Sequence, residues 1–289
     1  MMRTVKNISQ SIPTLEGAGV RLNRVFGYHQ VPLFDPFLLL DHFGSRNPED
    51  YIKGFPWHPH RGIETVTYML AGQIEHSDSI GNTGVIDAGD LQWMTAGSGI
   101  IHQEMPKKYD GFLQGFQLWV NLPAQKKMRE PRYRGITRDQ VPTVHHNDAT
   151  IKIIAGKVAN TQGPVTDLMV DIEYFDVMLS NGKEFVWKTK KGYTTLIYVI
   201  GGSGSTDEKV ITPRHCVLFS DGDSVTVYAK DVLRFLFITG QPLNEPIAWG
   251  GPIVMNTEVE LEQASKELDE GTFIKTSKSV PITTGYYRR

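Results

Sequence analysis

Three histidines and two glutamates are the residues of this chain whose types and spacing best suit metal chemistry. His58, His60 and Glu64 lie in one stretch, and His102 and Glu104 lie in another. Residues i, i+2 and i+4 of an extended strand point to one face, so the members of each stretch would project together. Two such strands side by side would bring up to five nitrogen and oxygen donors to one point. The spacing therefore predicts a metal site without a thiolate ligand.

The segments that must position these donors have the pattern of short β-strands. Apolar, alternating runs extend from residue 20 to residue 120 and resume from residue 151 to residue 240. Turn signals interrupt the first region at Gly72, Gly81-Asn82, Gly84 and Gly89-Asp90. Strands at this spacing favour a sandwich or barrel over alternating strands and helices. We therefore expect an all-β chain around the predicted metal site.

One segment near the C-terminus has a helical pattern instead. Thr257 and Glu260 have the form of a capping box, and apolar residues then recur at helical spacing until Gly271. We expect a short helix there that packs on a sheet as a lid. The sequence indicates no catalytic or binding role for its residues.

Composition restricts the class of protein. The chain has 289 residues, 40% of them hydrophobic, with a formal net charge of −2. This charge gives no basic signal for nucleic acid or an anionic membrane, and the lone Cys216 excludes an intrachain disulfide. The N-terminus lacks the apolar stretch of a secretion signal, and no apolar run is long enough to span a bilayer. We expect a cytoplasmic protein, or a nuclear one in a eukaryote, that contacts neither nucleic acid nor membrane directly.

An internal repeat indicates two domains of the same fold. The segment Gly62–Gly72 aligns with Gly192–Gly202 at a constant offset of about 130 residues. Two barrels in tandem would account for the length, and we predict a domain at residues 1–135 and a second at residues 136–289. The region 123–144 is rich in Lys and Arg, and we interpret it as a solvated linker, with a phosphate-binding patch as the alternative.

The second copy of the repeat has lost the candidate ligands. The offset of 130 places Lys188 opposite His58, Lys190 opposite His60 and Thr194 opposite Glu64. Further on, an offset of 125 places Val227 opposite His102 and Ala229 opposite Glu104. A cationic lysine and an apolar valine bind no metal, so we expect the second barrel to be metal-free. The contrast also indicates that the donors of the first copy are not required by the fold.

These motifs resemble those of the cupins, and most closely those of the pirin family. The resemblance covers nearly the whole chain, and the segments that carry it are Leu40–Gly44, His58–Gly62, Glu64–Tyr68, Gln92–His102, Leu118–Pro123 and Gly251–Thr257. It implies a bicupin, with two jelly-roll β-barrels packed face to face and iron in the N-terminal barrel only. The family pattern further implies His58, His60, His102 and Glu104 as the four metal ligands.

The resemblance also implies two possible functions. Some pirins have quercetin 2,3-dioxygenase activity, and a nuclear animal member is an iron-dependent transcriptional co-regulator. The first possibility would make this chain an oxidoreductase that cleaves a flavonol with O2 and releases carbon monoxide. The second would make it a redox-dependent regulator that binds a protein partner through the basic stretch Lys126–Arg138. A cupin that uses its metal only as a Lewis acid is a third possibility.

The donor set allows several metals and two candidate bases. Fe(II) is the metal that we expect, while Mn, Ni, Cu and Zn also accept imidazole and carboxylate ligands. Glu104 would take the hydroxyl proton of the flavonol, and Glu64 is the second candidate for this catalytic role. Glu64 could instead be a partner of the ligands or a strand-face acid paired with Arg61. We interpret His76 as a structural residue.

Overall fold

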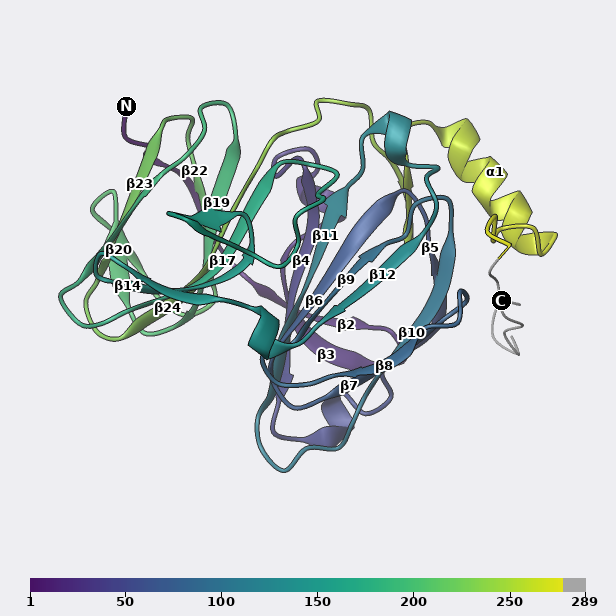
Figure 1. Ribbon diagram of the computed structural model, residues 1–289, viewed down its shortest axis with the longest axis horizontal. Helices are drawn as coiled ribbons and strands as arrows, with labels where there is room; N and C mark the ends of the chain where they lie inside the picture. Colours follow the sequence, from purple (N-terminus) through teal and green to yellow (C-terminus); the bar gives the residue numbers. More distant parts are fainter. Residues whose placement is uncertain (278–289) are drawn as a thin grey trace. The chain divides into compact units, whose positions relative to one another are not determined.

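The computed structural model describes residues 1–277 and divides the chain into two compact units (Figure 1). We call the unit that contains residues 13–33, 37–138 and the segment from Asn244 onward the first barrel. The second barrel consists of residues 1–12, 34–36 and 139–243. The predicted boundary after residue 135 thus lies close to the change of unit after Arg138. The N-terminal strand and the C-terminal segment, however, each belong to the unit opposite to the one expected.

The first barrel consists mainly of two sheets. Seven strands form the larger sheet in the order β12-β9-β6-β11-β4-β3-β2. Their bounds are β2 (Ile12–Glu16), β3 (Val20–Phe26), β4 (Phe37–Ser45), β6 (Ile63–Ala71), β9 (Leu91–Thr95), β11 (Leu113–Asn121) and β12 (Arg132–Ile136). The smaller sheet has the order β5-β10-β7-β8, with β5 (Phe55–His60), β7 (Ile74–Asp78), β8 (Thr83–Ile86) and β10 (Ile100–Pro106). Short 3-10 helices lie at Tyr28–Gln30, Pro48–Asp50 and Ala124–Lys126.

The second barrel repeats this arrangement of strands. Its larger sheet has the order β1-β22-β19-β24-β17-β14-β13, and its smaller sheet has the order β18-β23-β20-β21. Strands β6 and β19, which contain the aligned repeats, are both third in their sheets, which confirms two barrels of one fold. The bounds in the larger sheet are β1 (Val5–Gln10), β13 (Thr143–His146), β14 (Ala149–Ala155), β17 (Ile172–Leu179), β19 (Thr194–Gly201), β22 (His215–Phe219) and β24 (Leu233–Gly240). The remaining elements are η4 (Arg138–Gln140), β15 (Lys157–Val158), β16 (Thr161–Gln162), β18 (Glu184–Lys188), β20 (Gly204–Thr206), β21 (Lys209–Ile211) and β23 (Ser224–Ala229).

Strand β10 illustrates how the sequence positions the site. Every second residue of β10 is buried, from Ile100 through His102 and Glu104 to Pro106. Side chains of a strand alternate between its two faces, so His102 and Glu104 share the interior face, as the spacing of two predicts. Ile100, on the same face of β10, belongs to a buried apolar cluster that also contains Ile63.

The region 123–144 is not a solvated linker, so that interpretation was wrong. Strand β12 within it pairs with β9 and completes the larger sheet of the first barrel. Lys127, one of its basic residues, is only 1% exposed. Its Nζ donates to the carbonyls of Gly62 and Val254, at 2.9 and 3.0 Å, and to Asn121 Oδ1 at 2.6 Å. Burial lowers the pKa of Lys127 to about 8.

The register of the second barrel corrects part of the repeat alignment. In the first barrel His58 lies opposite His102, and in the second barrel Phe185 lies opposite Val227. The buried residues of β18 are Phe185 and Trp187, whereas Lys188 is exposed, so Lys188 does not occupy the interior position that His58 has in the first barrel. Phe185, Val227 and Trp187 belong to one buried apolar cluster. The interior of the second barrel at this level is thus filled by hydrocarbon side chains.

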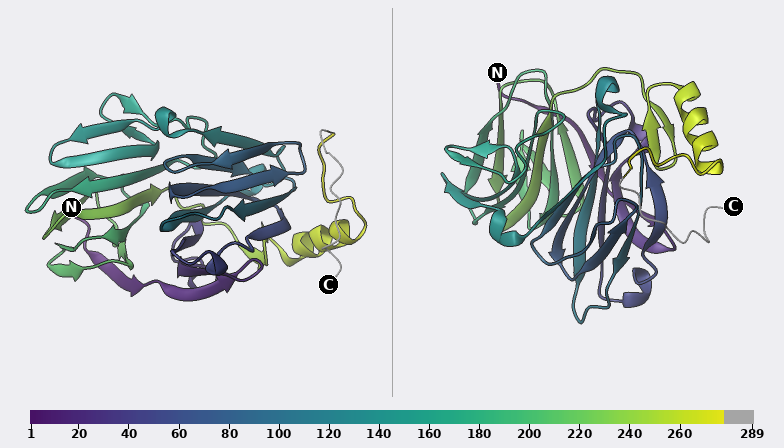
Figure 2. Two further views of the ribbon diagram at one scale, coloured as in Figure 1. Left: turned by 90° about the horizontal axis from the view of Figure 1, so that it is seen from below. Right: turned by 45° about the vertical axis from the view of Figure 1, so that its right-hand side comes forward.

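The helix predicted near the C-terminus is confirmed as α1 (Glu258–Asp269), with Thr257 and Glu260 forming the capping box. It lies beside the two-stranded sheet of β25 (Ala248–Gly250) and β26 (Ile253–Met255), at the edge of the first barrel (Figure 2). Buried Ala264 and Phe273 pack with residues of β26. Within residues 1–277, no helix is long and apolar enough to cross a membrane.

Candidate metal centre

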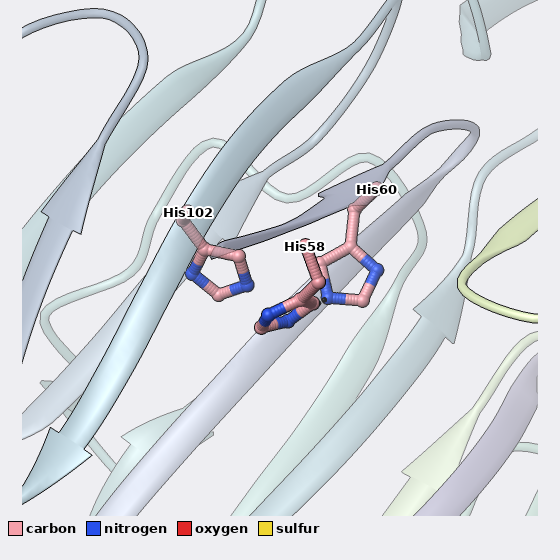
Figure 3. Close-up of side chains that lie close together, drawn as sticks. All are labelled: His58, His60 and His102. Atoms are coloured by element: carbon pink, nitrogen blue, oxygen red, sulfur yellow. Dashed lines mark hydrogen bonds between the residues drawn. The ribbon is translucent and has the colours of Figure 1, made fainter. Parts of the chain in front are cut away.

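Two neighbouring strands bring three imidazoles together in the first barrel (Figure 3). Strands β5 and β10 are antiparallel, and His58 lies directly opposite His102. His60 is two residues further along β5 and points to the same face. One ring nitrogen of each of the three histidines lies within 4.8 Å of those of the other two. Among the described residues, this is the group of histidines, cysteines and carboxylates that could hold a metal ion.

Backbone carbonyls fix the tautomers of the two histidines on β5. His58 Nδ1 lies 2.8 Å from the carbonyl of Pro56, and His60 Nδ1 lies 2.9 Å from the carbonyl of Pro252. A carbonyl only accepts hydrogen bonds, so each Nδ1 carries the proton and each Nε2 has a bare lone pair. The two Nε2 atoms lie 3.1 Å apart. Two lone pairs at this distance repel each other unless a proton or cation lies near both.

The third histidine is held by a buried pair on the next strand. His102 Nδ1 lies 3.5 Å from His76 Nδ1, and His76 Nε2 lies 3.1 Å from Asp78 Oδ2. The Asp78 carboxylate accepts from His76 Nε2–H, which leaves His76 Nδ1 as an acceptor for His102 Nδ1–H. His102 Nε2 is then unprotonated. It is buried and has no hydrogen-bond partner among the described residues.

Burial keeps all three imidazoles neutral. It lowers the pKa of His58 to about 4 and that of His60 to about 3, and it lowers the pKa of His102 well below its ordinary value. The neighbouring histidines add to the shift, because each would repel a charge on the next. Neutral imidazole is the form that binds metals. Three unprotonated nitrogens, one of them an unpaired buried atom, therefore fit a divalent cation.

Glu104 shares the interior face with His102 but is not in the close group of donor atoms. Its Oε1 lies 2.8 Å from Thr67 Oγ1, on the facing sheet. The register of β10 and β5 shifts between His102, which is opposite His58, and Glu104, which is opposite Phe55. Burial raises the pKa of Glu104, so its carboxyl is a stronger base than an exposed one.

Glu64 lies apart from the three imidazoles and makes other contacts. Its Oε1 accepts from Thr95 Oγ1 at 2.5 Å and lies 3.3 Å from Arg134 Nη2. The alternative that Glu64 pairs with Arg61 was wrong, because Arg61 pairs with Glu267 at 2.7 Å. Glu64 is not among the residues that line the cavity beside the histidines.

A cavity of about 830 Å³ opens beside the imidazoles. His58, His60 and Glu104 are part of its wall. Large aromatic side chains also line it, among them Tyr28, Trp57, Trp119 and Trp249. Trp119 meets the ring of His60 edge to face, with the ring centroids 5.0 Å apart. The volume lies within the range of small-molecule sites, so a flat aromatic compound could be admitted next to the donor atoms.

His76 and Asp78 are partners of the site that the motifs did not predict. Their spacing of two on β7 was a signal, because it places both side chains on one face of the strand. Local sequence could not tell that β7 pairs with β10, where His102 lies opposite Asp78. The basic stretch expected to bind a protein partner is also less available than predicted, because Lys127 is buried and Arg134 pairs with Glu64.

Comparisons with known proteins agree with this architecture. The pirin family model matches residues 19–120, and the model of the pirin C-terminal cupin domain matches residues 174–274. A pirin-like protein of Caulobacter vibrioides is 42% identical over 94% of this chain and 99% of its own length. Human pirin is 41% identical over 86% of both chains. A crystal structure of quercetin 2,3-dioxygenase from Acinetobacter baumannii has a TM-score of 0.88 and 33% identity, and the match covers 94% of this chain and 99% of that one.

Proposed function

Because this chain belongs to the pirin family, we propose that it is a metal-dependent dioxygenase of the quercetin 2,3-dioxygenase type. The metal ligands are His58, His60, His102 and Glu104, and Fe(II) is the metal. The observation that carries the proposal is the aromatic cavity of about 830 Å³, whose wall includes His58, His60 and Glu104. A regulator that acts only through its surface has no need of such a cavity. A structure titled as a quercetin 2,3-dioxygenase also matches this chain over nearly its full length.

The residues of the chain have separate tasks in this reaction. A divalent metal at the three imidazoles supplies a positive charge for the substrate oxygen and a site for electron exchange with dioxygen. The carboxylate oxygen of Glu104 that does not bind the metal takes the proton of the flavonol 3-hydroxyl, since this side chain lines the cavity and burial raises its pKa. Trp119 and the other aromatic residues hold the flat substrate and exclude water from it. Glu64, outside the cavity lining, supports the larger sheet through Thr95 and Arg134.

The reaction balances without an external reductant. Both atoms of O2 enter the organic product, and the two carbon–carbon bonds at carbon 3 of the flavonol break. Carbon 3 leaves with its own oxygen as carbon monoxide. The flavonol supplies all the electrons that reduce dioxygen, so no second cofactor is required.

The test is a turnover assay with defined metal content. The protein is loaded with one equivalent of Fe(II) under nitrogen, mixed with quercetin and exposed to oxygen. We expect the flavonol absorbance to disappear in step with the release of one carbon monoxide per quercetin. His102→Ala should abolish this activity, whereas His145→Ala, which changes an exposed histidine of the second barrel, should leave it unchanged. Iron-loaded wild-type protein that turns over no faster than His102→Ala would refute the proposal.

A further inference from the structure

A row of polar side chains crosses one wall of the aromatic cavity. Thr67, Gln117, Asp41 and Arg24 come from the neighbouring strands β6, β11, β4 and β3, and all four line the cavity. The register pairs Thr67 with Gln117, Gln117 with Asp41, and Asp41 with Arg24. We call these four residues the polar row. It is continuous across four strands of a wall that otherwise carries many aromatic side chains.

One end of the polar row adjoins Glu104. The hydroxyl of Thr67 lies 2.8 Å from Glu104 Oε1 and 2.6 Å from Gln117 Oε1. A hydroxyl has one proton, so Thr67 donates to only one of these two oxygens at a time. The amide nitrogen of Gln117 donates to no other described residue, which leaves it available to a molecule in the cavity.

The other end of the polar row is an ion-pair cluster with excess negative charge. Arg24 binds both oxygens of Asp41, from Nε at 2.9 Å and from Nη2 at 2.8 Å, and its Nη1 lies 2.7 Å from Glu16 Oε1. Burial raises the pKa of Asp41 to about 6 against the opposing effect of Arg24, so Asp41 is mainly ionised at pH 7 and above. One cation then faces two carboxylates. Such a cluster repels an anionic ligand but accepts hydrogen bonds from hydroxyl groups.

The rest of the cavity lining carries aromatic side chains, and these limit the shape of a ligand that contacts the polar row. Trp249 contacts both Trp119 and Tyr28, with ring centroids 5.8 and 5.6 Å apart. These side chains, like the polar row, line the cavity. A ligand that satisfies both kinds of contact has flat aromatic faces and hydroxyl groups on its edge.

We propose that the polar row is a subsite for the hydroxyl groups of a neutral aromatic ring, with Asp41 as the principal acceptor. At the ordinary spacing of about 4.8 Å between strands, Asp41 lies about 10 Å from Thr67, the residue that contacts Glu104. The hydroxylated ring therefore binds away from Glu104, and the reacting end of the ligand lies towards the histidines. This inference rests on the proposed function, which it extends by defining the substrate class as polyhydroxylated and uncharged.

Binding measured without turnover tests the subsite. Calorimetric titrations under nitrogen at pH 7 compare quercetin with galangin, the flavonol that lacks both hydroxyls of the pendant ring. Wild-type protein should bind quercetin about tenfold more tightly than galangin, as expected for one hydrogen bond to a charged group. Asp41→Asn should reduce this preference to about twofold or less. Gln117→Met, which keeps the side-chain volume, should also weaken it and serves as a second test if Asp41→Asn misfolds.

The control is Glu49→Gln, which removes an exposed carboxylate outside the cavity lining and should retain the full preference. Equal binding of quercetin and galangin by the wild type would overturn the inference. So would a tenfold preference that survives in both Asp41→Asn and Gln117→Met. Retention of the preference in a protein that does not consume quercetin would instead refute only the proposed reaction.

Discussion

The Nδ1 atoms of His76 and His102 face each other at 3.5 Å. Two ring nitrogens in this arrangement share one proton, so the tautomer of His76 determines that of His102. Asp78 controls His76 in turn, through the contact of 3.1 Å with its Nε2. Asp78, which lies opposite His102 on β7 and acts through His76, therefore keeps His102 Nε2 free to bind a metal.

Asp78→Asn should move the ring proton of His76, and with it that of His102, to the other nitrogen of each ring. Asp78 Oδ1 accepts from the backbone N–H groups of Ile80 and Asn82, so the asparagine oxygen should keep these bonds and its amide nitrogen should face His76. His76 would then carry its proton on Nδ1, and His102 would carry its proton on Nε2. We expect metal affinity to fall at least tenfold, measured by competition with a chelator.

Nitrogen NMR of the metal-free protein reports the tautomer directly. His102 should change from protonated Nδ1 in the wild type to protonated Nε2 in Asp78→Asn. Glu75→Gln, an exposed change on the same strand, is the matched control and should alter neither the affinity nor the spectrum. An unchanged His102 tautomer in Asp78→Asn would show that Asp78 only supports the fold.

Acid should destabilise the metal-free protein through its buried histidines. The pKa of His60 is lowered to about 3, whereas the unfolded chain binds a proton at its ordinary pKa of about 6.5. Between these values the unfolded state holds the extra proton, so stability is lost as the pH falls from 6.5 towards 3. Each such histidine contributes about 1.4 kcal/mol per pH unit. Denaturant unfolding in chelator at pH 4.5 to 7.5 measures the slope, and His60→Gln should make it shallower by about that amount. Parallel slopes for both proteins would contradict this origin.

Gly62, next to the ligand strand, should tolerate no side chain. Its φ is +78°, and a Cβ would lie 1.9 Å from the carbonyl oxygen of Val254. Gly62→Ala therefore combines an unfavourable backbone conformation with a clash, and we expect a loss of about 3 kcal/mol or more. Gly251 has a φ of +56° but open space around a Cβ, so Gly251→Ala should cost only about 1 kcal/mol. Equal unfolding free energies for the two variants would argue against the clash.

Glu267 of α1 should stabilise the first barrel through buried Arg61. Burial alone would raise the pKa of Glu267, but hydrogen bonds from Gln263, Lys275 and Arg61 lower it to about 2. Glu267→Gln leaves the Arg61 guanidinium, which is 2% exposed, without a counter-charge and should cost about 3 kcal/mol. The loss should be complete above pH 4.5 and should shrink as the pH falls towards 2. Glu262→Gln, an exposed change on the same helix, should cost less than about 0.5 kcal/mol.

The spacing of the histidines and glutamates predicted the three imidazoles at the centre of the site but not all of the residues around them. His58, His60 and His102 could be found because alternation along a strand is a local property. The position of Glu104 depends on a shift of register between β10 and β5 just after His102, and no local pattern reveals such a shift. The link of His76 to His102 depends on which strands pair, which is decided by the fold as a whole.

The repeat predicted two barrels but not their equivalent positions. A fixed offset placed Lys188 opposite His58, whereas Lys188 is exposed and the buried residues of β18 are Phe185 and Trp187. Loops of unequal length between the strands change the offset from one element to the next. The sequence also did not predict that each terminal segment belongs to the other unit. The residues of a strand do not show which distant strand it pairs with. By contrast, the capping box at Thr257 and Glu260 specified the start of α1 correctly, since capping is local.

Anomalous X-ray scattering at the iron edge, from crystals of protein loaded anaerobically with Fe(II), tests the central claim most directly. We predict a single peak per chain, within bonding distance of the Nε2 atoms of His58, His60 and His102 and of a carboxylate oxygen of Glu104. We predict no peak among Phe185, Trp187 and Val227 of the second barrel. The account would be contradicted by iron bound elsewhere with the three imidazoles unligated, or by iron inside the second barrel.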